Sequence, residues 1–427
     1  MGMCLLLSAS TLDFDLFKMP SQSEDSPRVL LIGGIQGDEP GGFNALNLFL
    51  QHYKILRGEV WVIPNLNRHS ILRNHRGIYG DMNRKFKTLS KNDPEYPLIE
   101  RLKSIVLNDK IDFIFHLHDG SGFYRESYIS KELNPNRWGN CSIIDQEKLK
   151  EAKYGNLLEY SQSVVKYVNA SALKNLHLYR VRNTHTAKED KEMEKSLTFF
   201  AVRNQKGALA NEASKSLPLN ERVYYHLLAV EGILKTLGVE FKRDFNLSPK
   251  KILEFINDNE AVVQITPLIA LPVMGLKKNI AFFPLPSKNI SQIPLSSTHY
   301  IMGLLQKNQE VLLKYGNRVV TQLSPFVIEF EKSTQKVQIQ VDGKIEEVKL
   351  GSIIKVKKGF KVLSSPLRVN VIGFTPKGRV GESEANYEIT LAKLLKKYSI
   401  DIRERQYRIE FYNGKKFAGM VIVDFER

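Results

Sequence analysis

Residues 29–42 read VLLIGGIQGDEPGG, an apolar run that leads directly into a glycine-rich turn carrying two acidic side chains. A buried strand followed by such a turn and then by a helix is the building unit of α/β proteins. The turn is not a nucleotide site, because it matches neither GxGxxG nor GxxxxGK[ST] and its carboxylates, Asp38 and Glu39, would repel a phosphate. A cation would be attracted by the same carboxylates, so the turn predicts a metal site.

Strand and helix patterns continue to alternate from this turn up to Gly238, where a helix C-cap is expected. This alternation predicts an α/β domain built around a largely buried sheet. The expected strands are 29–32, 60–63 and 111–118, with 178–181, 198–202 and 208–212 as less regular ones. The expected helices are 43–52, 98–107, 151–168 and 221–237.

After Gly238 the sequence becomes proline-punctuated and β-rich, with one helix expected over 248–258. Residues 337–341 alternate strictly between apolar and polar, and Asp342-Gly343 supplies a type I′ turn into a partner strand over 344–350. Asn413-Gly414 repeats this device near the C-terminus. We therefore expect an α/β domain over 1–238, a middle β-rich domain over 239–334 and a C-terminal β-sandwich or barrel over 335–427.

The chain is strongly basic, with 62 Lys and Arg residues against 46 Asp and Glu residues in 427, a formal charge of +16. Such an excess favours an anionic partner. We expect no nucleic-acid binding, because no RNP-like, zinc-finger or P-loop pattern is present. No apolar stretch reaches the roughly 20 residues that span a bilayer, so no membrane span is expected. The two cysteines, Cys4 and Cys141, support neither a disulfide framework nor a cysteine metal site.

The first ten residues, MGMCLLLSAS, resemble the end of a secretory signal, although the basic region that precedes such a signal is missing. The alternative is a frayed terminus with a few buried leucines. The segment therefore suggests export without establishing it.

Further polar groups that suit a metal site follow the third predicted strand. The segment His116-Leu117-His118-Asp119 ends this strand, and strand alternation puts both histidines on one face. Between the two strand ends lie residues 65–76 and 80–86, which are rich in Arg, Asn and His. These are either a solvated basic loop or a set of donors that bind a carboxylate and stabilise an oxyanion.

These motifs resemble the zinc metallocarboxypeptidases related to the pancreatic digestive enzymes. Gln36-Gly37-Asp38-Glu39 resembles the HxxE ligand pair of that family, residues 81–86 (DMNRKF) its DLNRNF segment, and His118 its third ligand. Asn211-Glu212 is similar to the segment that holds the catalytic glutamate. The resemblance covers roughly residues 1–238 and implies a mixed central sheet flanked by helices.

The first ligand is the one departure, because Gln36 stands where the family has histidine, and an amide oxygen is a weaker zinc ligand. Glutamine there, with basic β domains appended, resembles the peptidoglycan DL-carboxypeptidases that determine helical cell shape in Gram-negative bacteria. This resemblance implies a periplasmic enzyme that releases terminal meso-diaminopimelate from the stem tripeptide of muropeptides and leaves a dipeptide. The β domains would be available to bind other cell-wall proteins.

The same resemblance implies a role for each residue of the site. One zinc ion would be held by Gln36, Glu39 and His118, with Glu212 as the general base, Arg76 (or its rival Arg73) at the oxyanion, and Asn83 and Arg84 on the substrate carboxylate. Outside the motifs that carry the resemblance, Trp138 and Thr198 are candidates for the cleft wall, and Asp119 is a candidate to orient His118. His116 is either a plain sheet residue, the interpretation that we favour, or a support of the zinc ligand.

Two other functions remain open from the sequence. A deacylase of N-acyl amino acids would use the same fold and a similar carboxylate clamp, and would release a small acid instead of an amino acid. A non-catalytic muropeptide-binding protein would follow if Gln36 marked a decayed metal site.

Overall fold

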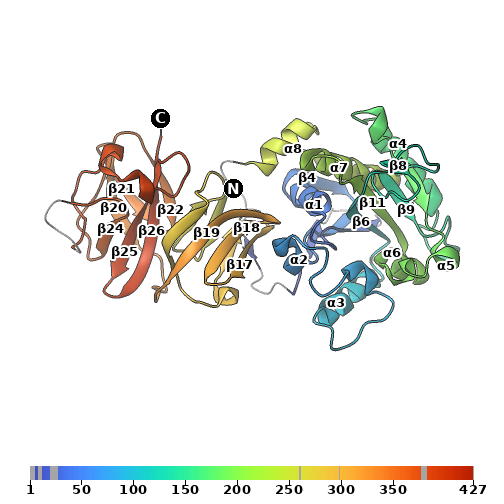
Figure 1. The fold of residues 1–427 in the computed structure, drawn as a ribbon, viewed down its shortest axis with the longest axis horizontal. Helices are drawn as coiled ribbons and strands as arrows, with labels where there is room; N and C mark the ends of the chain where they lie inside the picture. The colour runs from blue at the N-terminus through green and yellow to red at the C-terminus, as the bar shows by residue number, and fades with distance from the viewer. Residues whose placement is uncertain are drawn as a thin grey trace. The chain divides into compact units, whose positions relative to one another are not determined.

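The computed structural model describes residues 5–7, 12–19, 27–258, 261–297, 299–376 and 382–426. It separates into two compact units, Ser10–Asn257 and Asp258–Arg427, the latter joined by Met1–Ala9. Figure 1 gives the element labels used below. In the described ranges, no helix has the length and apolar character needed to cross a membrane.

The unit Ser10–Asn257 is built on a seven-stranded mixed sheet with the order β10-β9-β11-β6-β3-β5-β2. The central strands β11, β6, β3 and β5 run parallel, whereas β2 pairs with β5 and β9 pairs with β11 in antiparallel fashion. The strands are β2 (Phe17–Met19), β3 (Arg28–Ile32), β5 (Glu59–Ile63), β6 (Phe113–Gly120), β9 (Cys141–Ile144), β10 (Arg180–Asn183) and β11 (Gly207–Ser214). The expected mixed central sheet is therefore confirmed.

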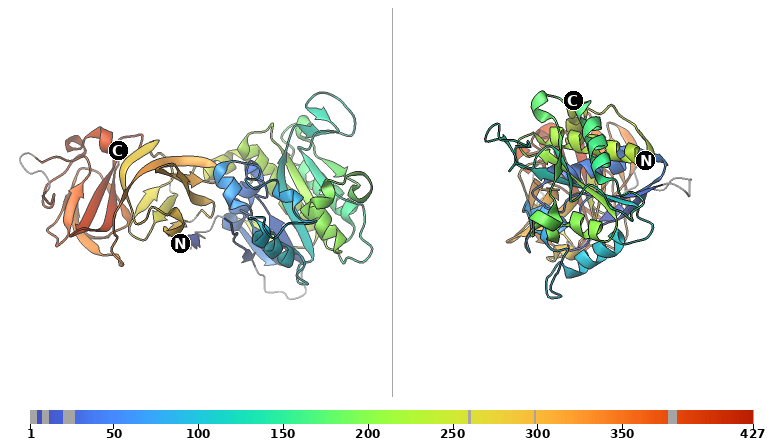
Figure 2. Two further views of the ribbon diagram at one scale, coloured as in Figure 1. Left: turned by 60° about the horizontal axis from the view of Figure 1, so that its bottom comes forward. Right: turned by 90° about the vertical axis from the view of Figure 1, so that its right-hand side faces the viewer.

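Helices cover both faces of this sheet (Figure 1 and Figure 2). One face carries α1 (Pro40–His52), α4 (Leu157–Asn169) and α7 (Leu219–Thr236), and α8 (Pro249–Ile256) packs on α7. The other face carries α3 (Tyr96–Val106) and α6 (Leu197–Arg203). Shorter elements complete the unit: α2 (Arg68–Arg73), α5 (Thr186–Glu189), the 3₁₀ turn η1 (Met82–Arg84), and the strand pairs β4 (Tyr53–Arg57) with β12 (Glu240–Arg243) and β7 (Phe123–Tyr124) with β8 (Leu133–Asn134).

One predicted strand is wrong. Residues 198–202 form most of α6, whose start is capped by Ser196, because the Ser196 hydroxyl accepts a hydrogen bond from the Phe199 amide at 3.2 Å. The run of Thr, Phe and Val suits a strand by propensity, but its burial and capping are helical. The place beside β11 is taken instead by β9, which the sequence pattern did not indicate.

Glycine in the turn after β3 allows the chain to pack very closely against its neighbours. A Cβ atom on Gly37 would lie 2.1 Å from the backbone of Ser70, and one on Gly41 would lie 2.3 Å from the Asp119 carboxylate. The turn can therefore reach both α2 and the end of β6 only with glycine at these positions. This close packing brings three separate segments to one edge of the sheet.

The unit Asp258–Arg427 consists of β-sheets. Its sheets have the orders β1-β16-β13-β14, β15-β19-β18-β17, β21-β20-β23 and β22-β26-β25-β24. The last two sheets share one hydrophobic core. The strands are β1 (Leu5–Leu7), β13 (Val262–Ile265), β14 (Ala270–Pro272), β15 (Asn279–Leu285), β16 (Leu295–Ser297), β17 (Met302–Lys307), β18 (Glu310–Tyr315), β19 (Arg318–Val327), β20 (Lys336–Val341), β21 (Lys344–Lys349), β22 (Ser352–Val356), β23 (Phe360–Val362), β24 (Arg368–Val371), β25 (Gln406–Asn413) and β26 (Lys416–Phe425).

Both predicted hairpins form in this unit. Asp342 and Gly343 have φ angles of 49° and 90°, as a type I′ turn requires, and β25 pairs with β26 across Gly414. The first compact unit extends beyond 238 to Asn257, because α8 packs on α7. The border near 334 lies inside the second unit and stays a prediction. Apart from β1, the N-terminal run 1–10 with its suggested signal character lies outside the described residues.

Candidate active site

A cavity of about 310 Å³ opens at the edge of the sheet where β3, β6 and β11 end, in the unit Ser10–Asn257. In open α/β sheets this edge is where ligands bind. All nine predicted site residues line the cavity: Gln36, Glu39, Arg76, Asn83, Arg84, His118, Trp138, Thr198 and Glu212. The structure thus brings together residues from six separate segments, although their individual roles stay predictions.

The three expected metal ligands all line this cavity, and all are buried. His118 Nδ1 is 2.9 Å from Glu39 Oε2, so the two expected ligand atoms lie next to each other. The amide nitrogen of Gln36 donates to Asp81 Oδ1 at 2.8 Å, and the buried Gln36 carbonyl oxygen accepts no hydrogen bond in the described part of the chain. An imidazole nitrogen, a carboxylate and an unused amide oxygen are a donor set that fits a divalent metal.

Within the described ranges, no group of three His, Cys, Asp or Glu side chains is arranged to hold a metal ion. A three-ligand site in this cavity therefore depends on the Gln36 oxygen.

The ring of His116 supports His118, the alternative that the sequence analysis had ranked below a plain sheet role. His116 Nδ1 lies 2.8 Å from His118 Nε2, and His116 Nε2 lies 2.7 Å from Thr198 Oγ1 on α6. Burial, and secondarily the neighbouring His118, hold the pKa of His116 well below its usual 6.5. His116 is thus a neutral group that orients His118, not a plain sheet residue.

Glu212 stands on β11 directly beside His118, because the two residues are register partners across β11 and β6. Burial raises the pKa of the Glu212 carboxyl well above its usual 4.5, and the charges of Glu39 and Asp119 raise it further. Its Oε2 has no hydrogen-bond partner among the described residues. A buried carboxyl with a raised pKa holds a proton more strongly than a free carboxyl, a property typical of general acid–base groups.

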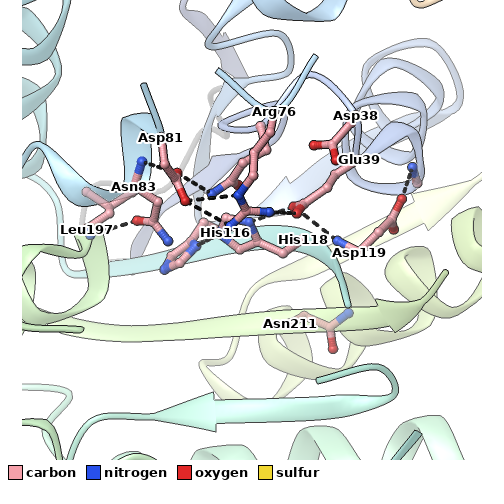
Figure 3. Close-up of polar contacts among 12 residues, drawn as sticks. Asp38, Glu39, Arg76, Asp81, Asn83, His116, His118, Asp119, Leu197 and Asn211 are labelled. Atoms are coloured by element: carbon pink, nitrogen blue, oxygen red, sulfur yellow. Dashed lines mark hydrogen bonds and ion pairs between the residues drawn. The ribbon is translucent and has the colours of Figure 1, made fainter. Parts of the chain in front are cut away.

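Arg76, and not its rival Arg73, is the guanidinium at the cavity. Arg76 Nη1 donates to Glu39 Oε1 at 3.0 Å, and its Nε and Nη2 grip Asp81 Oδ2 at 3.0 and 2.9 Å. Arg73 instead points back along α2, with Nη1 3.1 Å from His69 Nδ1, and is not part of the cavity wall. Figure 3 shows Arg76 beside Glu39 and Asp81.

Asn83 and Arg84 belong to the 3₁₀ turn η1, which Asp81 caps by accepting a hydrogen bond from the Asn83 amide at 2.9 Å. The Asn83 side-chain oxygen accepts from the Leu197 amide at 3.0 Å, which ties η1 to the start of α6. Asn83 and Arg84 both line the cavity, and Figure 3 shows Asn83 on the side of Glu39 away from Asp119.

Three family models together match nearly the whole chain. Residues 2–257 match the model described as the catalytic domain of a carboxypeptidase controlling helical cell shape. Residues 258–329 match the β-barrel domain of carboxypeptidase M99, and residues 330–426 match the C-terminal domain of metallo-carboxypeptidase. The chain belongs to the M99 carboxypeptidase family. The resemblance drawn from Gln36, Glu39, His118 and DMNRKF is thus confirmed, and the chain is a metallocarboxypeptidase.

Solved structures of an M99 family member resemble the chain over its whole length. The apo form of cell shape determinant protein Csd4 from Helicobacter pylori is 48% identical, with a TM-score of 0.93 over 97% of this chain and 100% of that one. Its mDAP-bound form, described as a D,L-carboxypeptidase, is 48% identical with a TM-score of 0.92 over 96% and 100%. Its tripeptide-bound form matches at 48% and 0.92 over 97% and 100%. No curated protein matched in sequence.

Asp119 plays a different part in this M99 enzyme from the one expected. Its carboxylate accepts hydrogen bonds from the Gly41 amide and Arg222, both at 2.8 Å, and lies 3.0 Å from His226 Nε2. His118 is not among these contacts, so the expectation that Asp119 orients His118 is wrong. Asp119 instead ties the start of α1 to α7, while its backbone amide donates to Glu39 Oε2 at 3.2 Å.

Arg222 and His226 were missed because only the apolar positions of the predicted helix 221–237 were used. Their spacing of four residues on α7 was the available signal, since it puts two polar side chains on one helix face.

Lys215 was also missed. Its ammonium group is 3.2 Å from Asp38 Oδ2 and 3.6 Å from Glu39 Oε1, and it lines the cavity at the end opposite Asn83. Its position three residues after Glu212 was the only available signal. At the cavity wall, Trp138 is held by the guanidinium of Arg182, which lies 3.6 Å above its ring.

Proposed function

We propose that the chain is a zinc-dependent D,L-carboxypeptidase that trims the peptidoglycan stem tripeptide to a dipeptide by releasing terminal meso-diaminopimelate, and thereby influences cell shape. The observation that carries the proposal is the pairing of Glu212, buried and with a raised pKa, with Gln36, Glu39 and His118 around one cavity. The mDAP-bound and tripeptide-bound forms of the related Csd4 support a muropeptide substrate.

One zinc ion would be held by Gln36, Glu39 and His118. The orphaned Gln36 oxygen and the close approach of His118 Nδ1 to Glu39 Oε2 support this assignment. When bound, zinc supplies a Lewis acid that polarises the scissile carbonyl and activates water. Asp81 keeps the Gln36 oxygen turned toward this position by holding the amide nitrogen.

Glu212 acts as the proton carrier of the reaction. As a carboxylate it accepts a proton from the attacking water, and as the acid it donates that proton to the leaving amine. Its raised pKa suits both steps, because burial disfavours the charged form. Arg76 stabilises the negative oxygen that develops on the scissile carbonyl, since its guanidinium is already held in place by Glu39 and Asp81.

Asn83 and Arg84 bind the free carboxylate of the terminal residue, which limits cleavage to the last bond of the chain. Trp138 and Thr198 complete the walls of the cleft on either side. A peptidoglycan substrate agrees with the formal charge of +16, because the polymer carries many carboxylates. We propose the periplasm as the site of action for the same substrate, and the β-rich part of the chain as a surface for other cell-wall proteins.

The proposal is tested by mass spectrometry of muramyl tripeptide incubated with the zinc-loaded full chain, with a chelator-treated sample and Glu212→Gln alongside. Loss of one diaminopimelate residue is expected only with the zinc-loaded wild type. Glutamine preserves the shape of Glu212 but carries no transferable proton, so the rate should fall by about 10³-fold with zinc content unchanged.

Other products would contradict the proposal. Release of a small acid from N-acyl amino acids, with the tripeptide left intact, would identify a deacylase. A tripeptide that binds to the zinc-loaded chain but stays uncleaved would identify a binding protein.

A further inference from the structure

A second cavity, of about 600 Å³, lies within the unit Asp258–Arg427 and is lined by residues of β15, β19 and β25, by Ile372 and by the segment 397–399. We propose that this cavity binds a neutral saccharide, of the N-acetylated amino-sugar type that forms a glycan strand. The inference goes beyond the proposed peptidase function, because it concerns residues that take no part in catalysis.

Exposed aromatic rings gather at this cavity. Phe282 is 80% exposed, Phe326 46% and Tyr398 44%, and these are three of the five exposed aromatic side chains in the described ranges. Both exposed phenylalanines of those ranges are among them. Aromatic faces left open to water around one cavity indicate a binding site, because water is a poor partner for them. The apolar C–H face of a pyranose ring is a ligand surface that packs on such rings.

The wall of the cavity also holds a buried ion pair with unused hydrogen-bonding capacity. Arg408 and Glu410 are each only 4% exposed, and Arg408 Nη1 lies 3.2 Å from Glu410 Oε1. Yet Arg408 Nε donates no hydrogen bond and Glu410 Oε1 accepts none in the described part of the chain. The other Glu410 oxygen accepts from the Tyr412 hydroxyl at 2.7 Å. Burying polar atoms without hydrogen-bond partners lowers the stability of the fold unless a ligand pairs with them.

The pair specifies the chemistry of the ligand. The positive and the negative group of the buried pair cancel, and the third charged side chain at the cavity, Lys397, is exposed to water, which screens its charge. One unused donor and one unused acceptor call for a ligand whose groups both accept and donate hydrogen bonds. Hydroxyl and acetamido groups of a sugar do both, and each sits on a ring with an apolar face. Together with the aromatic rings, the pair thus favours a neutral saccharide over a charged ligand.

The most exposed of these rings is held in a strained conformation. Phe282 has a φ angle of 49°, which bulky side chains rarely adopt, and the pairing of β15 with β19 is broken between Ile280 and Phe283. The Arg408 guanidinium donates to the carbonyl oxygens of Ala281 and Phe282, both at 3.2 Å. Arg408 therefore fixes the backbone that turns the Phe282 ring outward, as is common where strain serves binding.

The same contacts argue against a peptide that adds to the sheet edge. An extended peptide pairing with β15 would need the carbonyl oxygens of Ala281 and Phe282 for its ladder. Both already accept from Arg408. A saccharide does not require these oxygens.

The experiment is titration calorimetry of the full chain with chitotetraose, a glycan that carries no peptide, using wild type, Phe282→Ala and Tyr398→Ala. Each substitution should weaken binding by about fivefold, the effect of losing one aromatic contact. Ile345→Ala is the matched control, because Ile345 is 61% exposed on β21 of the same unit and not part of the cavity. Its affinity for chitotetraose should equal that of wild type.

Two further readouts keep this proposal separate from the peptidase function. Tripeptide hydrolysis should be unchanged in all variants, and chitotetraose should bind equally well after zinc is removed. Absence of chitotetraose binding to folded wild type, or binding unaffected by both aromatic substitutions, would overturn the proposal. Displacement of chitotetraose by free tripeptide would overturn it as well, because it would assign the binding to a peptide.

Discussion

The side-chain amide of Gln36 donates a hydrogen bond to Asp81 Oδ1 at 2.8 Å, and this contact determines which end of the glutamine faces the cavity. With the nitrogen held by a carboxylate, the oxygen is the end left without a hydrogen-bond partner in the described part of the chain, and Gln36 lines the same cavity as Glu39 and His118. Asp81 belongs to the DMNRKF segment, so the segment that holds Asn83 and Arg84, the proposed substrate ligands, also orients Gln36, the proposed metal ligand. In the proposed zinc site, this preorganisation offsets the weaker donor strength of an amide oxygen.

Substitution of Asp81 tests this relationship. In Asp81→Asn the 3₁₀ cap at η1 can persist, but the asparagine amide no longer selects the orientation of Gln36. We expect zinc affinity to fall by about 10- to 100-fold, measured by competition with a chromogenic chelator. Asp112→Asn, at the opposite end of the sheet where Asp112 accepts from the Arg28 amide, serves as the control. Equal zinc affinity in Asp81→Asn and wild type would contradict the assigned role.

Replacement of Arg76 tests whether Arg76 or Arg73 stabilises the oxyanion. Lysine keeps the positive charge of Arg76 but lacks the planar fork that contacts Glu39 and Asp81 together. We expect Arg76→Lys to lower kcat for the tripeptide by about 10²-fold while zinc content stays the same. Arg73→Lys is the matched control and should leave kcat unchanged, because Arg73 does not line the cavity. The reverse pattern would assign the oxyanion to Arg73.

Asp119 should matter for stability as well as for the site. Its buried carboxylate pairs with Arg222 and with His226 and accepts from the Gly41 amide. Asp119→Asn leaves the partner charge on α7 without compensation, so we expect a loss of about 3–5 kcal/mol in the free energy of unfolding. Urea denaturation followed by the fluorescence of the two tryptophans measures it. Asp38→Asn is the control, because it breaks a partly exposed ion pair with Lys215. It should lower the free energy of unfolding by less than about 1 kcal/mol.

Stability should also depend on pH through a carboxyl far from the metal ligands. Asp145 follows β9 and accepts hydrogen bonds from Thr184 and Thr186. Burial, only partly offset by these bonds, raises the pKa of Asp145 from its usual 3.8 to about 6. Between about pH 4 and 6 the folded state therefore binds a proton at Asp145 that the unfolded state does not bind. The contribution of this proton to the free energy of unfolding is complete below pH 4 and is lost as the pH rises through 6.

The neutral variant Asp145→Asn removes that proton equilibrium. Relative to wild type, Asp145→Asn should gain stability as the pH rises from 4 to 7, by up to about 3 kcal/mol. Denaturation curves of both proteins at several pH values in that range measure the difference. A difference that stays constant with pH would show that Asp145 titrates normally.

Local sequence patterns predicted much of the fold and the position of the site. The buried runs 29–32, 60–63 and 111–118 became β3, β5 and β6 because a continuous apolar strand can be buried only in the centre of a sheet. The turn with Glu39 and the alternation that puts His116 and His118 on one face then followed from strand geometry alone. The hairpin at Asp342-Gly343 was equally local, because its turn type depends on two residues.

The features that local patterns did not predict depend on contacts between distant segments of the chain. The segment 198–202 has the composition of a strand, but its cap at Ser196 and its packing made it a helix, which brought Thr198 to His116. Asp119 pairs with Arg222 and His226 on α7, which are more than 100 residues away in the sequence. Arg76 contacts Glu39 whereas Arg73 contacts His69, and this difference depends on the path of the chain after α2 ends at Arg73. Propensity acts over a few residues, whereas burial and charge pairing depend on which segments the fold brings together, so these features appear only in the folded chain.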